Sequence, residues 1–99
     1  MKLHFTAPLW LWAGKGAWHF ITLPEDESQV IRMAVPRGGQ NRGWGSVRVT
    51  ATIGESRWQT SIFPDTGRNA YLLPIKAEIR RAESLSVGEA VEVSLSLDL

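Results

Sequence analysis

The stretch VRVTATIGESRWQTSI, residues 47–62, decides the fold because it has the pattern of a complete antiparallel hairpin. Apolar and polar side chains alternate at period two on both sides of Gly54-Glu55, as in two half-buried strands. A two-residue turn with glycine first, typical of type II′, sets the register. Directly paired residues share a face, so the apolar set meets in the pairs Ala51–Trp58, Val49–Thr60 and Val47–Ile62. The opposite face is polar and holds Arg48, Thr50, Thr52, Arg57, Gln59 and Ser61.

Further short elements surround this hairpin. Strands are predicted over residues 3–13 and 18–23, which form a first hairpin around Gly14-Lys15-Gly16, and over 71–73 and 90–97. Short helices are predicted between Pro24 and Pro36 and over residues 75–84, and a turn at residues 64–67. The order of these predicted elements along the chain is dominated by antiparallel hairpins. We therefore expect a mainly β fold, a small closed or half-closed barrel with two short capping helices.

The alternation assigns a direction to each side chain of the outer strands. In the first strand Leu3, Phe5, Ala7, Leu9 and Leu11 share one face, while His4, Thr6, Trp10 and Trp12 share the other. In the last strand Val91, Val93, Leu95 and Leu97 are predicted to point inward. In the first helix the apolar stripe is predicted to be Val30, Ile31 and Ala34.

Length and composition limit the class of protein. The chain has 99 residues, a formal net charge of +1 and no cysteine, so we expect one domain over residues 1–99 without disulfides or thiol chemistry. The uncharged stretch from Leu3 to Gly14 is shorter than the roughly 20 residues that a membrane span needs. Pro8 interrupts it, so it is a poor signal peptide as well, and we expect a cytoplasmic protein.

Several segments together resemble a known family. They are AGKGAWHFITLP (residues 13–24), Thr60–Pro64, Tyr71–Pro74 and Lys76–Ala82, and the similarity spans nearly the whole chain. The chain resembles a small bacterial family of unknown function, whose members occur alone or joined to a YdeI-type bacteriocin-protection module. Glu89 stands where the family usually has aspartate. The resemblance implies a double-split β-barrel like that of the AbrB-type transcription factors, and it implies no activity.

The sequence contains no convincing catalytic or metal-binding motif. The segment Gly54–Trp58 approaches G-x-S-x-G but lacks the last glycine and lies in a hairpin turn instead of a strand-to-helix elbow. His4 and His19 have no metal-ligand spacing. We place them on the two strands of the first hairpin, where they would face one another. We therefore expect a protein that is not an enzyme and has no cofactor or metal.

The glycine-rich stretch RGGQNRGWG, residues 37–45, allows two interpretations. It lacks the lysine and the following helix of a phosphate-binding P-loop. Arg37, Arg42 and Trp44 could contact nucleic acid through phosphate pairing and base stacking. The alternative is a plain connection between elements.

The distribution of charge points to an anionic partner. Residues 32–81 contain nine basic and three acidic side chains, a local charge of +6. Turn residues such as Asp65, Thr66 and Asn69 add hydrogen-bonding groups. The leading hypothesis is a binding module with a basic surface that accepts an unknown anionic ligand. The predicted ligand-binding residues are Arg48, Arg57, Ser61, Arg68, Tyr71, Lys76 and Arg80.

Two other functions stay open at this point. One is a nucleic-acid-binding regulator, by analogy with AbrB-type barrels, although a shared fold does not by itself transfer function. The other is an enzyme acting on a small substrate, which the missing motifs disfavour. No membrane partner is expected, and the protein is predicted to be a monomer or a homodimer.

Overall fold

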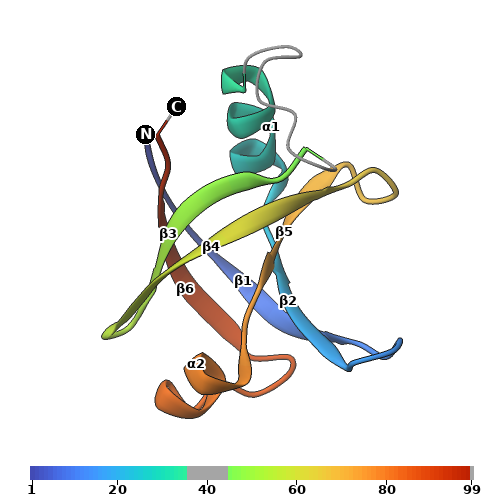
Figure 1. The fold of residues 1–99 in the computed structure, drawn as a ribbon, viewed down its shortest axis with the longest axis vertical. Coiled ribbons are helices and arrows are strands. Elements are labelled where there is room, and N and C mark those ends of the chain that lie inside the picture. The colour runs from blue at the N-terminus through green and yellow to red at the C-terminus, as the bar shows by residue number, and fades with distance from the viewer. Residues whose placement is uncertain (36–44, 99) are drawn as a thin grey trace.

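The computed structural model describes residues 1–35 and 45–98, which form a closed antiparallel barrel with two short helices (Figure 1). The elements in chain order are β1 (Lys2–Trp12), β2 (Trp18–Thr22), α1 (Glu25–Ala34), β3 (Val47–Ile53), β4 (Ser56–Asp65), β5 (Ala70–Pro74), α2 (Ala77–Ala82) and β6 (Ala90–Ser96). The mainly β barrel with two capping helices is therefore confirmed. A relationship to AbrB-type barrels stays a prediction.

The strands close in the order β1-β2-β5-β4-β3-β6, so that β6 returns to β1. The long strand β1 makes this closure possible because it serves two neighbours. Its first part, Lys2 to Pro8, pairs with β6, and its last part, Leu9 to Trp12, pairs with β2. Strands β2 and β5 thus lie across the barrel from β3 and β6.

The central hairpin has the predicted register. Ala51 pairs with Trp58, Val49 with Thr60 and Val47 with Ile62. Gly54 adopts a φ of 57°, a left-handed conformation that glycine reaches without steric cost, and Glu55 is not among the residues with positive φ. This combination is that of the predicted type II′ turn.

Several predicted boundaries and directions are wrong. The predicted turn at residues 64–67 lies further along, because Pro64 and Asp65 still pair with β5. Leu11 is 43% exposed rather than inward, since the end of the first hairpin extends past the core, and Val30 is exposed on α1. His4 and His19 do not face each other, because His4 pairs with Ser94 of β6 and His19 with Leu11.

The two helices lie at opposite ends of the barrel (Figure 1). Each contributes one fully or nearly buried isoleucine to the core, Ile31 from α1 and Ile79 from α2. Burying such a side chain contributes about 1.5–3 kcal/mol, which is enough to dock a short helix that would not be stable alone. No helix in the described part of the chain is long and apolar enough to cross a membrane.

A buried serine ties α1 to the sheet. The Ser28 hydroxyl donates to the Leu23 carbonyl oxygen (3.2 Å) and accepts from the Tyr71 backbone N–H (3.1 Å). The side chain of Ser28 is completely buried, so both bonds are shielded from water. Together with the Leu23 N–H, which donates to the Tyr71 carbonyl (2.9 Å), they fix the end of β2 and the start of α1 against β5.

Candidate functional site

The outer surface of β1, β2, β5 and β4 carries a cluster of aromatic side chains. Strand pairing builds it in rows, because directly paired residues point to the same side of a sheet. The rows are Trp12–Trp18, then Trp10–Phe20–Pro74, then Thr22–Leu72–Phe63. We call this surface the aromatic face and define it by Trp10, Trp12, Trp18, Phe20, Phe63 and Leu72.

The rings of the aromatic face form a continuous, shallow platform. Trp18 and Phe20 are nearly parallel, with centroids 6.1 Å apart and planes inclined by 10°, and Trp10 lies 5.3 Å from Phe20. They line a surface hollow of about 480 Å³. Trp12 and Trp18 remain 47% and 52% exposed. Soluble proteins rarely leave such a contiguous apolar surface open to water unless it binds something.

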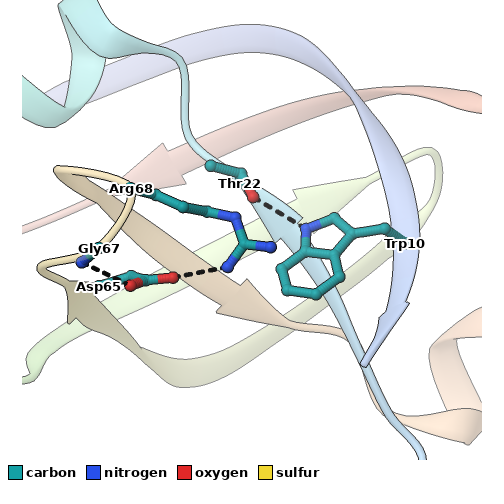
Figure 2. Close-up of polar contacts among 5 residues, drawn as sticks. All are labelled: Trp10, Thr22, Asp65, Gly67 and Arg68. Atoms are coloured by element: carbon teal, nitrogen blue, oxygen red, sulfur yellow. Dashed lines mark hydrogen bonds and ion pairs between the residues drawn. The ribbon is translucent and has the colours of Figure 1, made fainter. Parts of the chain in front are cut away.

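A network of polar contacts positions one arginine at the edge of this platform, as Figure 2 shows. The Arg68 guanidinium stacks over the Trp10 ring, 4.3 Å from its centroid, and its Nη1 lies 2.7 Å from Asp65 Oδ2. Asp65 Oδ1 accepts from the Gly67 N–H (3.0 Å), which fixes the carboxylate. The Trp10 indole N–H donates to Thr22 Oγ1 (2.8 Å), which fixes the ring. Both partners of the guanidinium are therefore held in place.

The contact between Asp65 and Arg68 makes stability depend on pH. The hydrogen bond from the Arg68 side chain is the largest cause that holds the pKa of Asp65 below its ordinary value of 3.8. A depressed pKa in the folded state adds stability that is fully present above the unfolded value and is lost as the pH falls through the folded value. We expect the difference in Tm between the wild type and Asp65→Asn to shrink when thermal unfolding is followed from about pH 6 down to pH 2. A difference that stays constant over this range would contradict the assignment.

A second cation borders the opposite end of β5. Lys76 follows Pro74 and lines a smaller hollow of about 190 Å³ together with Trp18 and Trp58. Its ammonium lies 3.6 Å from Glu78 Oε1, and both side chains are largely exposed. Since Arg68 precedes β5 and Lys76 follows it, the two cations flank the aromatic face along the direction of this strand.

The structure does not bring the seven predicted ligand-binding residues together on one surface. Arg68 and Lys76 border the aromatic face. Arg48, Arg57 and Ser61 lie on the outer surface of the central hairpin, where Arg48 Nη1 donates weakly to Ser61 Oγ (3.4 Å).

Tyr71 and Arg80 are occupied by the fold itself. Tyr71 is only 6% exposed, and burial raises the pKa of its phenol. It is therefore poorly placed for the predicted role in ligand binding. Arg80 Nε donates to the Ile75 carbonyl and Nη1 to His19 Nε2, each at 3.3 Å. Helix α2 begins at Ala77 and Lys76 is its N-cap residue, so the helix predicted from residue 75 starts two residues later.

Two further expectations concern other parts of the chain. Arg37, Arg42 and Trp44 of the glycine-rich stretch lie outside the described residues. Within residues 1–35 and 45–98, no group of three or more histidine, aspartate or glutamate side chains is arranged to hold a metal ion.

The aromatic face itself was not among the predicted sites. One signal was present in the sequence, because alternation in residues 3–13 already places Trp10 and Trp12 opposite the apolar set. Their neighbours Phe63 and Leu72 come from β4 and β5, and the pairing of β5 with β2 has no local signature.

Fold and site together define a small six-stranded antiparallel barrel with an exposed aromatic surface flanked by two cations. The chain belongs to the DUF1905 family, a domain of unknown function whose model matches residues 5–95. A search of curated proteins finds no match to the chain. The family assigns no activity, so the function has to be argued from the surface.

Proposed function

We propose that the protein is a non-enzymatic binding module whose aromatic face holds nucleotides, ligands that combine planar rings with anionic phosphates. The observation that carries this proposal is the set of five aromatic side chains that point outward in cross-strand rows. Sheet surfaces that expose aromatic rings are a common way to stack unpaired bases. Each stacked base contributes about 1–3 kcal/mol, and stacking tolerates any base because every base has a π face.

The two flanking cations supply the electrostatic part of the binding. Arg68 is stacked on Trp10 and bonded to Asp65, so little side-chain entropy remains to be lost when it meets a phosphate. Lys76 offers a flexible ammonium at the other end. Seven residues, 69–75, separate the two positions, and the five of them that form β5 alone extend about 17 Å at the rise of an antiparallel strand. A span of this length favours a short single strand over one mononucleotide.

The polar groups on the face support binding rather than catalysis. Asp65 is engaged by Arg68 and the Gly67 N–H, and Thr22 accepts from Trp10. Within the described residues of this face, no hydroxyl or carboxylate is paired with a general base as a nucleophile would require.

Replacing Trp18 by alanine tests this function. We expect the dissociation constant for a labelled single-stranded oligothymidine, measured by fluorescence anisotropy at low salt, to rise by roughly five- to a hundredfold. Trp18→Phe keeps a ring and should retain most of the affinity. Met33→Ala is the matched control, because Met33 is an apolar side chain, 77% exposed, on α1.

The same assay separates the two sources of nucleotide. Competition by adenosine monophosphate as strong as by an unlabelled oligonucleotide would assign a mononucleotide site. Oligonucleotide binding that falls steeply with salt, and less steeply in Lys76→Ala, would assign a single-stranded nucleic acid. Wild-type protein that binds neither probe, or a Trp18→Ala variant that binds as tightly as the wild type, would overturn the proposal.

A further inference from the structure

The opposite side of the barrel has a different chemistry. Two rows cross the outer surface of β1, β6, β3 and β4 through direct strand pairs. The first row is Lys2–Ser96–Thr50–Gln59, and the second is His4–Ser94–Thr52–Arg57. The middle positions of both rows are hydroxyl side chains, and the outer positions of the second row are a histidine and an arginine.

These rows form the floor of a hollow of about 470 Å³. We call it the hydroxyl hollow and define it by Lys2, His4, Thr50, Thr52, Arg57, Ser94 and Ser96, which line it with Leu3 and Leu95. The four hydroxyl residues are half-buried, so the floor is partly shielded from water. No carboxylate is among the lining residues.

Two acidic groups lie beside the hollow without lining it. Glu92 lies one row further along β6 and contacts His4 Nε2 at 3.2 Å. Asp98 lines an adjoining hollow of about 240 Å³ together with Arg48. Within the described part of the chain, neither Lys2 nor Arg57 takes part in an ion pair. Their charges therefore remain available to a ligand.

We propose that the hydroxyl hollow is a binding site for a tetrahedral oxyanion of the phosphate type, separate from the aromatic face. Lys2 and Arg57 would supply charge from opposite sides of the floor, and the hydroxyl groups would donate hydrogen bonds to the oxygens. Arginine suits this role because its planar fork of N–H groups matches two phosphate oxygens. His4 Nδ1, at the edge of the floor, lies 2.8 Å from Ser94 Oγ and orients that hydroxyl. The inference does not depend on the proposed function, since no residue of the aromatic face lines the hollow.

A titration of the ¹⁵N-labelled protein with inorganic phosphate, at ionic strength held constant with sodium chloride, tests the site. We expect saturable changes in the amide resonances of Thr50, Thr52, Ser94 and Ser96. Arg57→Gln should weaken the binding about ten- to a hundredfold, as expected for the loss of one charge-assisted contact. Arg81→Gln, which removes an exposed arginine from α2, should bind phosphate as the wild type does.

The same spectra distinguish loss of binding from loss of folding. The dispersion of the amide resonances shows directly that each variant is folded. Equal binding of sulfate and of a phosphomonoester such as glycerol 3-phosphate would show that the site recognises the oxyanion group itself. Changes that do not saturate, that centre on Arg68 or Lys76, or that persist unchanged in Arg57→Gln would overturn the proposal. Phosphate binding that survives in Trp18→Ala would separate this site from the aromatic face.

Discussion

Replacing Leu73 by alanine is expected to lower the free energy of unfolding by about 3–4 kcal/mol. Leu73 is fully buried in β5 and pairs with Ile21 of β2, at the seam that joins the first hairpin to β4 and β5. Removing its isobutyl group loses transfer free energy and leaves a cavity that a closed barrel cannot easily collapse. Urea unfolding followed by tryptophan fluorescence measures the loss.

Two variants show that the effect comes from the cavity. Leu73→Met conserves most of the volume and should cost less than about 1.5 kcal/mol. Met33→Ala removes an exposed side chain and should change the stability by about 0.5 kcal/mol at most. A loss below about 1 kcal/mol in Leu73→Ala would mean that the seam is not packed as described.

Ser28→Ala is expected to cost about 2 kcal/mol, a large effect for the loss of one oxygen atom. The variant leaves the Tyr71 N–H without its acceptor in a buried place, and it also removes the bond to the Leu23 carbonyl. An unsatisfied buried donor costs more than the net value of a typical hydrogen bond. The stability can be measured by urea unfolding, and amide exchange at Tyr71 should become faster in the variant.

Ser86→Ala is the matched control, because Ser86 is exposed and the bond that Glu89 accepts at this position comes from the backbone N–H. Its stability should stay within about 0.5 kcal/mol of the wild type. If Ser28→Ala and Ser86→Ala proved equally mild, a buried water would have to replace the lost hydroxyl.

The central hairpin shows what local sequence determines. Alternation and a glycine-led turn were sufficient to predict every pair from Val47–Ile62 to Ala51–Trp58, because both strands carry a clear apolar face. The boundaries were less predictable. Pro64 suggests a turn, yet it lies within β4 and pairs with Tyr71 of β5. Tertiary pairing there outweighs the local preference of proline.

The candidate site was harder to predict because it depends on which distant strands meet. Counting charges grouped Arg48 and Arg80 with Arg68, and the fold separates them. Tyr71 is buried at the end of the barrel that α1 covers, where its backbone forms hydrogen bonds with Ser28 and Leu23. No sequence pattern near Tyr71 predicts these contacts. The rows of the hydroxyl hollow likewise require the pairing of β1 with β6 across almost the whole chain.

The closure of the barrel limits how any partner can attach. Each of the six described strands has two neighbours in the closed sheet, so none of them is a free edge along its whole length. Partial edges remain where a strand meets its second neighbour over a few residues, as in β4, which pairs with β5 only at residues 63–65. A peptide that joins the sheet by β-augmentation, through main-chain hydrogen bonds, would have to fit such a short segment. Side chains on the outer wall, in contrast, are presented around the whole barrel. Affinity in this protein should consequently respond to point substitutions on that wall more than it would in a domain with a long free edge strand.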